Sequence, residues 1–416
     1  MAMSLPTYGA LSATSANVIR GSEPSFVELA AAKKLGFFVN NVEFSESEGN
    51  ISPTDVKEFY RFLKLGDFSI KTLTAADIDY FDIDGDEPAV LPFTIGTQSY
   101  EWFEADDTKI EDMNKMVGCG NNFKYPLKLK ITVEDIQAHS EYGLPRAGIN
   151  TTLVKEYSIA PEEGICYARP NSLDWRHDTY PPDTEGFIDE YLGGGYRKEF
   201  DPDNGFIATN ATKFPTTGFP GAQFKLVMTG PASDYSFDLI ENPNGAAQID
   251  SSTGMITLKE KPMGTGNITV RVIKTNSQLP PFDYTFNPTS VWALPQLGTA
   301  KFYDSAVKCG GSTANFLKRV ELTNGVGSAS DPPRNNPNGG IAYFTRAIGE
   351  GVLAEWGTTV NGVYPKSDWS DELYAMYWTP EFYSGVNEVF IVMPYDGYYG
   401  DYTITDPTRV YSVCRG

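Results

Sequence analysis

Residues 213–226 read Lys-Phe-Pro-Thr-Thr-Gly-Phe-Pro-Gly-Ala-Gln-Phe-Lys-Leu, and we call them the decisive stretch. Proline and glycine mark a turn at each end, because proline presets one backbone angle and glycine tolerates conformations that other residues avoid. Its apolar residues suit the inner face of a strand pair: Phe214, Phe219, Phe224 and Leu226. We therefore expect a β module to open about half-way along the chain.

The residues that follow continue this module as short strands. Short strands separated by turn residues at regular intervals are typical of a β-sandwich. We therefore predict one sandwich module over residues 206–288. Its strands are expected at residues 223–228, 235–239, 255–258 and 267–273.

The front of the chain is also predicted to be β-rich. Residues 125–133 alternate apolar and polar side chains, which is the pattern of a half-buried strand. We expect one domain over residues 1–170, with short helices over residues 24–33 and from Ser52 onward. Residues 171–205, rich in glycine and proline, are predicted to be a connector. Further strands of the front domain are expected at residues 36–39, 89–95, 99–103 and 165–167.

The last part of the chain, residues 289–416, mixes helix and strand patterns. A short helix is expected at residues 304–309. A second helix is expected where four apolar residues recur at steps of four before Gly357, namely Phe344, Ile348, Val352 and Trp356. Strands are then expected at residues 377–379, 388–393 and 410–414.

Charge and hydropathy limit the classes of partner. The chain has 416 residues and a formal net charge of −21. An acidic surface repels phosphate backbones, so we do not expect a nucleic-acid partner. No apolar run reaches the roughly 18 residues of a membrane-spanning helix, so we expect no transmembrane segment.

Four cysteines point to disulfides. They are widely spaced, without the Cys-x-x-Cys pattern of a zinc site. We pair Cys119 with Cys166 and Cys309 with Cys414, because each pair lies within one predicted domain. Disulfides persist in oxidising compartments, so we expect export through the periplasm to the cell surface or the medium.

The order of these motifs resembles the intimin/invasin family of enterobacterial adhesins. The Phe-Pro-Thr-Thr-Gly run and the glycine-rich stretch at residues 193–196 resemble the start of an immunoglobulin-like repeat. Matches to the C-type-lectin-like end of the family lie at residues 306–309, 355–357, 377–379 and 413–415. The resemblance implies a mainly β, multi-domain fold, with immunoglobulin-like β-sandwich modules followed by an α+β C-type-lectin-like domain.

The resemblance also implies a function. It suggests an adhesin-type passenger, not an enzyme, that binds a protein or glycan receptor on a host-cell or bacterial surface through residues 289–416. An outer-membrane intimin-like translocator would be its export partner. Two alternatives stay open: a soluble exoprotein exported through a separate intimin-like barrel, and a secreted hydrolase that uses carboxylates. A third is a structural spacer without a ligand at its tip.

The predicted contact surface lies near the C-terminus. Tyrosine is enriched at interfaces because it buries a large area at low entropic cost. Alternatively, these side chains pack on a sheet face. The candidate binding residues are Tyr395, Tyr398, Tyr399, Tyr402, Lys366 and Trp369.

An acidic loop is the sharpest local signal for a metal. Asp82, Asp84 and Asp86 alternate around Gly85, and calcium prefers several carboxylate oxygens. The spacing departs from an EF-hand loop, so a solvated acidic loop is the alternative. We expect no required cofactor, with calcium as the candidate ion. His139 and His177 lack the motif of a serine hydrolase.

Overall fold

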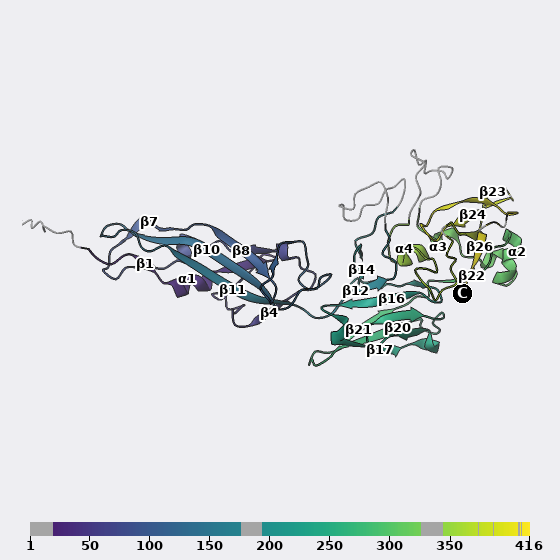
Figure 1. Ribbon diagram of the computed structural model, residues 1–416, viewed down its shortest axis with the longest axis horizontal. Helices are drawn as coiled ribbons and strands as arrows, with labels where there is room; N and C mark the ends of the chain where they lie inside the picture. The colour runs from purple at the N-terminus through teal and green to yellow at the C-terminus, as the bar shows by residue number, and fades with distance from the viewer. Residues whose placement is uncertain are drawn as a thin grey trace, which may run out of the picture. The chain divides into compact units, whose positions relative to one another are not determined.

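The chain folds into two compact units, which we describe separately (Figure 1). The computed structural model describes residues 20–175, 194–325 and 344–416, except residues 373, 386, 407 and 409. The first unit comprises Met1–Val117 and Phe123–Glu162, and the second comprises Gly118–Asn122 and Glu163–Gly416. Both are built mainly from β-sheets, so the predicted mainly β fold class is confirmed.

Two long strands form the centre of the first unit. They are β10 (Leu127–Ser140) and β11 (Thr151–Pro161), paired antiparallel. The predicted alternation is confirmed, because alternate residues from Leu127 to Val133 are buried. The remaining strands of this sheet are β4 (Val56–Phe59), β7 (Pro88–Thr94), β8 (Gln98–Phe103) and β9 (Lys109–Ile110).

Small elements close the core of the first unit. A three-stranded sheet joins β2 (Gly36–Val39), β3 (Val42–Ser45) and β5 (Phe68–Ile70). Helix α1 (Glu28–Lys34) follows strand β1 (Ser25–Phe26), which pairs with β6 (Tyr80–Phe81).

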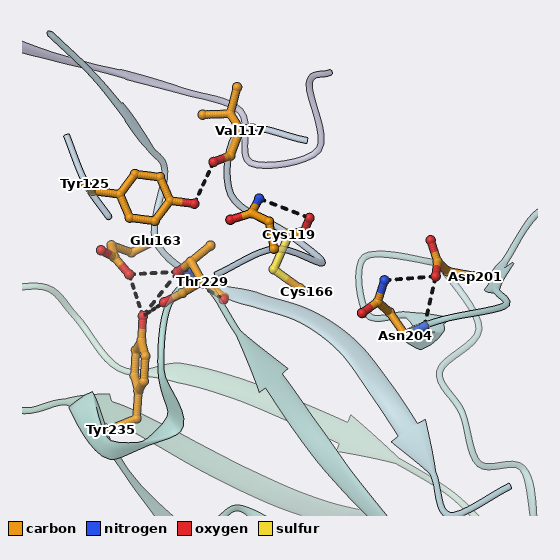
Figure 2. Close-up of a disulfide and its surroundings, with 11 residues drawn as sticks. Val117, Cys119, Tyr125, Glu163, Cys166, Asp201, Asn204, Thr229 and Tyr235 are labelled. Carbon is orange, nitrogen blue, oxygen red and sulfur yellow. Dashed lines mark hydrogen bonds between the residues drawn. A yellow bond between two sulfur atoms is a disulfide. The ribbon is translucent and has the colours of Figure 1, made fainter. Parts of the chain in front are cut away.

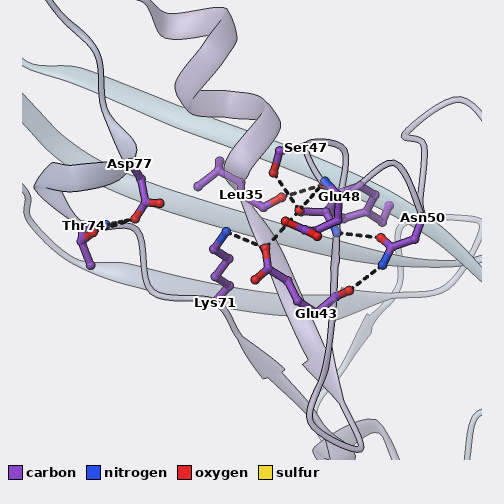
Figure 3. A network of polar contacts seen from close by, with 10 residues as sticks. Leu35, Glu43, Ser47, Glu48, Asn50, Lys71, Thr74 and Asp77 are labelled. Carbon is purple, nitrogen blue, oxygen red and sulfur yellow. Dashed lines mark hydrogen bonds and ion pairs between the residues drawn. The ribbon is translucent and has the colours of Figure 1, made fainter.

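Polar contacts tie these small elements together (Figure 3). Lys71 Nζ lies 2.5 Å from Glu43 Oε1, and Asn50 Nδ2 donates to the Glu43 carbonyl at 2.6 Å. Tyr157 donates its hydroxyl proton to the Leu35 carbonyl at 2.6 Å, which joins β11 to the end of α1. The small elements are therefore fixed on the large sheet by hydrogen bonds as well as by apolar packing.

The helix predicted from Ser52 is wrong. Residues Val56–Phe59 form strand β4, which runs parallel to β11. Phe59 is buried and its ring lies 5.1 Å from that of Phe68. Pairing with β11 and burial of this ring outweigh the local helix signal of Pro53 and Asp55, because strand formation depends strongly on tertiary context.

The middle of the chain forms two sheets of the second unit. One contains β12 (Ile165–Pro170), β13 (Phe200–Asp201), β14 (Gly205–Ile207), β16 (Gln223–Met228), β18 (Ala247–Ile249) and β19 (Met255–Leu258). The other contains β17 (Tyr235–Glu241), β20 (Ile268–Lys274) and β21 (Phe282–Phe286). Their buried residues belong to one hydrophobic core, as the predicted sandwich requires.

A third sheet and three short helices form the last part of the second unit. We call residues 289–416 the cap. The sheet order is β15 (Thr217–Gly218), β22 (Val291–Gln296), β26 (Val410–Arg415), β23 (Met376–Ser384), β24 (Glu388–Val392) and β25 (Tyr399–Thr403). The helices are α2 (Phe302–Ala306), α3 (Arg319–Leu322) and α4 (Val352–Trp356). Strand β15 lies within the sandwich segment of the sequence but pairs with β22 of the cap.

Short 3₁₀ turns connect several of these elements. Two, η5 and η6, lie in the cap, and the other four lie between strands. They are η1 (Leu65–Asp67), η2 (Ala75–Asp77), η3 (Ala232–Asp234), η4 (Pro243–Gly245), η5 (Val307–Cys309) and η6 (Thr313–Asn315).

The predicted helix with a four-residue stripe is only partly correct. Helix α4 includes Val352 and Trp356, but Phe344 and Ile348 lie outside it. Gly351 precedes the helix with φ +112°, a left-handed conformation that an α-helix does not contain. The apolar spacing therefore reflects burial in the core and not one continuous helix.

Both predicted disulfides are confirmed. Cys119 pairs with Cys166 of β12 (Figure 2), and Cys309 of η5 pairs with Cys414 of β26. Strand β12 was expected in the front domain, but it pairs with β16 and lies in the second unit together with Cys119. The finer division of the chain into four segments stays a prediction.

Among the described residues, no helix is long and apolar enough to cross a membrane.

Candidate functional site

The cap and the sandwich module meet at a buried carboxylate, Glu355 of α4. Glu355 accepts hydrogen bonds from the backbone N–H groups of Thr216, Thr217 and Gly349 at 2.8–3.0 Å. It also accepts from the hydroxyls of Thr216 and Thr217 at 2.7 and 2.6 Å. Burial raises the pKa of Glu355, although these donors stabilise its charged form. Residues 216–217 of the decisive stretch are therefore held by the cap.

A buried arginine completes this junction. Arg346 donates from Nη1 to the carbonyls of Ser172 and Asp174, each at 3.0 Å, and from Nη2 to the Glu355 carbonyl at 2.8 Å. Burial lowers the pKa of Arg346 to about 10, so it is charged at neutral pH. We call Arg346, Glu355 and their hydrogen-bond partners the junction.

The junction joins module and cap within one compact unit. Trp356 of α4 is buried and donates from Nε1 to the Thr217 carbonyl at 3.2 Å. Its ring lies 4.9 Å from Phe214 and 5.4 Å from Phe219, two of the apolar residues in the decisive stretch. Helix α4 of the cap therefore packs directly on the start of the module through hydrogen bonds and ring contacts.

Catalysis by Glu355 is not supported by this geometry. Its side chain is fully buried and its oxygens are already occupied by protein donors. A general acid or base must reach a proton of the substrate. His139 shares a 2.9 Å hydrogen bond with Thr94, and His177 lies outside the described residues.

The predicted contact residues do not form one surface. Trp369 is only 2% exposed, and its ring packs 5.7 Å from Phe219 and 5.0 Å from Tyr377. Tyr399 is also buried, with the Arg319 guanidinium 4.1 Å from its ring centre. These two predicted residues belong to the core, because large aromatic rings bury most of their apolar area there.

The other predicted residues differ in their exposure. Tyr395 is 44% exposed and Lys366 is exposed, so both stay available to a partner. Tyr398 and Tyr402 are partly buried, and Tyr402 donates to Asp406 Oδ2 at 3.2 Å. Partial burial of Tyr398 and Tyr402 agrees with the alternative that these tyrosines pack on the fold instead of forming a contact surface.

A buried aspartate shapes the loop between these tyrosines. Asp396 accepts a hydrogen bond from the Tyr398 N–H at 2.9 Å. Burial raises the pKa of Asp396 to about 6. The loop therefore contains a carboxylate that titrates at mildly acidic pH.

Sequence reasoning missed an apolar surface at the start of the cap. Tyr303 is 59% exposed, and Val307 and Phe382 are exposed as well. Tyr303 and Phe382 both lie against the buried ring of Phe302, with centroid distances of 5.1 and 5.8 Å. We call Leu297, Tyr303, Val307 and Phe382 the cap patch. The available signal was the four-residue spacing between Tyr303, which directly precedes the helix expected at residues 304–309, and Val307 within that helix.

A lysine connects the cap patch to its flank. Lys308 Nζ donates to the carbonyls of Leu297 and Gly298 at 2.7 and 2.6 Å. This holds the segment that carries the exposed Leu297 beside η5. The Cys309–Cys414 disulfide links η5 to β26, so the backbone beside the cap patch is covalently attached to the sheet.

A polar groove lies elsewhere in the second unit, beside Lys366. Its volume is about 390 Å³. The groove offers amide, hydroxyl and charged groups to a polar ligand. The polar lining residues are Gln223, Gln248, Asp250, Ser251, Thr257 and Lys366.

The acidic loop at residues 82–86 forms a hydrogen-bonded turn. Asp82 Oδ1 accepts from the backbone N–H groups of Asp84 and Asp86 at 2.8 and 3.4 Å, so it closes a turn. Within residues 20–175, 194–325 and 344–416, the gaps at four single positions aside, no group of three or more histidines, cysteines or carboxylates could hold an ion. The described residues therefore give no support for calcium at this loop, and both alternatives stay predictions.

Comparison with known families identifies the sandwich module. Residues 198–286 match the family described as Invasin, domain 4. The predicted resemblance to the intimin/invasin family is confirmed through this segment. No curated protein matches the chain.

Several solved structures are similar at low sequence identity. Invasin, described as a bacterial integrin-binding protein, is 12% identical, with a TM-score of 0.38, over 96% of this chain and 73% of that chain. A 282-residue C-terminal intimin fragment, in complex with the intimin-binding domain of the translocated intimin receptor (Tir), is 15% identical, with a TM-score of 0.34, over 81% and 92%. An intimin mutant of EHEC O157:H7 is 17% identical, with a TM-score of 0.32, over 52% and 93%.

Proposed function

We propose that this chain is an adhesin-type passenger that binds a surface partner on a host cell or a bacterium through its cap. The match of residues 198–286 to Invasin, domain 4, carries the proposal. The junction supports it, because the cap is braced against that module by Glu355 and Arg346. Binding, and not catalysis, is the activity.

The cap patch is the contact surface that the structure favours. Its apolar side chains are exposed, and the neighbouring turn η5 is linked to β26 by a disulfide. Binding therefore does not need to order this part of the backbone. Interfaces of this kind gain most of their affinity from a few aromatic anchors. Tyr303 and Phe382 are the proposed anchors, and Tyr395 and Lys366 are secondary candidates from the sequence.

The export route is part of the same proposal. Both disulfides require an oxidising compartment, which the periplasm supplies. We propose an intimin-like outer-membrane protein as the translocator and the cell surface or the medium as the destination. The partner on the receiving surface is a protein or a glycan.

The test uses the full chain, because the cap shares its core with the module. Fluorescently labelled chain is applied to cultured epithelial cells. In separate assays it is titrated with two purified proteins, an integrin and the intimin-binding domain of Tir. A double variant with Tyr303→Glu and Val307→Glu places two charges in the cap patch. Binding should fall roughly tenfold or more, because loss of the Tyr303 anchor together with a charge at its neighbour Val307 should cost more than about 1.4 kcal/mol.

A matched control carries charges on exposed apolar residues of the module, Ile240→Glu and Met263→Glu. Thermal unfolding checks that both double variants are folded. Equal binding by the cap-patch variant and the wild type would overturn the assignment of this surface.

A further inference from the structure

Strand β7 lies at one end of the first unit (Figure 1). Several apolar side chains on and near this strand are exposed. Val90 is 91% exposed, Leu91 79% and Ile83 71%. Monomeric proteins rarely leave large apolar side chains gathered in one place unless that place binds something. We call Phe81, Ile83, Val90, Leu91 and Ile149 the front surface.

Aromatic contacts bring the segments of this surface together. Phe93 of β7 lies 6.2 Å from Phe26 of β1 and 6.4 Å from Tyr80 of β6, measured between ring centroids. The same Phe93 pairs with Ala138 of β10. These contacts place β1, β6 and β7 next to one another at this end of the first unit.

An irregularity in β7 pushes two of the apolar residues outward. Phe93 faces Ala138 and Pro88 faces Ser140, so β7 has more residues in this interval than β10. Val90 and Leu91 lie within the excess. Pro88 and Pro92 lack N–H donors, which makes this strand a poor template for pairing with another strand. The surface therefore offers side chains to a partner, not a backbone edge.

A small pocket opens in the same region. Its volume is about 170 Å³, roughly six times the ~30 Å³ share of a water molecule, which suits one long side chain. Phe26 and Ala138 form a buried apolar base, and Ile149 is an exposed wall. Glu23 and Glu28 are the acidic lining residues, and neither carboxylate has a hydrogen-bond or ion-pair partner in the described chain.

Charge around the front surface is strongly negative. Its segments are residues 20–28, 79–94 and 138–151, with eight carboxylates against two arginines. The carboxylates are Glu23, Glu28, Asp79, Asp82, Asp84, Asp86, Glu87 and Glu141, and the arginines are Arg20 and Arg146. An apolar surface with an acidic rim is complementary to an apolar surface with basic residues.

We propose that the front surface is a second binding site, which takes a basic segment of a protein partner. A lysine or arginine side chain enters the pocket, where its aliphatic stem contacts Phe26 and Ile149 and its charge lies near Glu23 and Glu28. Val90 and Leu91 contact apolar residues that flank this side chain. The site is separate from the cap patch and does not depend on it.

Charge decides against two other occupants. A second copy of the chain would bring the same acidic rim against itself, and the whole chain has a net charge of −21. Like charges brought face to face cost free energy. A membrane with anionic lipids is disfavoured for the same reason.

The test is a peptide-binding titration with the full chain. The probe is a fluorescent decapeptide of alternating lysine and leucine, and the comparison peptide has glutamate in place of lysine. We expect saturable binding of the basic peptide by fluorescence anisotropy, weakened by salt, and none of the acidic peptide. The double variant Glu23→Gln with Glu28→Gln should bind roughly tenfold more weakly, since each partly buried ion pair contributes a factor of a few.

A second variant and a matched control make the result decisive. Val90→Ser with Leu91→Ser should also weaken binding, while Glu58→Gln with Glu162→Gln, exposed carboxylates elsewhere in the first unit, should not. Equal losses in the pocket and control variants would show general attraction to an acidic chain and overturn the proposal. Unchanged binding in both front-surface variants would overturn it as well. The cap-patch variant is expected to bind the peptide normally, so this test is independent of the proposed adhesin function.

Discussion

Two carboxylates of this chain, Glu355 and Glu28, have opposite surroundings. Glu355 is fully buried in the junction and accepts hydrogen bonds from two threonines and Gly349. Glu28 is exposed, lines a pocket and has no partner among the described residues. A buried charge with all its donors holds a structure together, whereas an exposed charge beside apolar surface is available for recognition.

The same contrast distinguishes the aromatic residues of the cap. Trp369 and Tyr399 are buried and stabilise the fold, while Tyr303 and Phe382 rest on the buried ring of Phe302 and are exposed. Aromatic residue type alone therefore does not identify the contact surface. The contact surface is better identified by exposed aromatic residues on an element whose other face is buried.

The largest expected effect is on the junction. Glu355→Ala should lower the free energy of unfolding by about 3–5 kcal/mol, because it leaves the buried donors of Thr216, Thr217 and Gly349 without an acceptor. Glu28→Ala should leave stability within error of the wild type. Urea unfolding of the full chain measures both. Similar values for the two variants would contradict the contrast between junction and front surface.

The next effect is pH-dependent and concerns Asp396. Its pKa in the folded protein, about 6, lies above the ordinary value of 3.8, so the folded state binds the proton more tightly. Stability should therefore fall as pH rises from about 4 to 6 and change no further above that. The full difference corresponds to roughly 3 kcal/mol.

Asp396→Asn tests this assignment. The amide keeps an oxygen that accepts from the Tyr398 N–H but cannot ionise. Unfolding midpoints are measured between pH 4 and 7. The decrease in stability between about pH 4 and 6 should be absent in the variant. An identical pH profile for variant and wild type would exclude Asp396 as its source.

Surface substitutions should have the smallest effects on stability. Val90→Ser with Leu91→Ser changes side chains that are largely exposed, so the unfolding free energy should shift by about 0.5 kcal/mol or less. Scanning calorimetry compares this variant with Leu129→Ser, which lies in the core of the same unit. Comparable losses in both would mean that Val90 and Leu91 are packed and not presented.

Regular strands and disulfides could be predicted from the sequence, because their signals are local or combinatorially simple. Alternation at residues 125–133 marks a buried face of β10, and four cysteines within two predicted domains suggested the pairs that form. Strand β4 could not be predicted, because its pairing with β11 brings together residues about a hundred positions apart. Burial of Trp369 depends in the same way on Phe219, from the distant decisive stretch.

The candidate site was predicted less well than the fold. The cap was named as the contact region, yet two of the six residues named on it are buried. Tyr303 and Val307 could have been found, because Tyr303 of α2 and Val307 of η5 are four residues apart and stand beside the buried Phe302 and Ala306. Glycines at positions 349 and 351 were a second available signal, because glycine is unfavourable inside a helix and both adopt positive φ here. They indicate that the apolar stripe before Trp356 is not one helix.

Competition for cell binding tests the central claim most directly. Labelled wild-type chain is bound to epithelial cells, and unlabelled full chain is added as wild type or as the variant with Tyr303→Glu and Val307→Glu. The wild type should displace the label, and the folded variant should need at least roughly tenfold more protein to do so. Equal displacement by the two proteins would contradict binding through the cap patch.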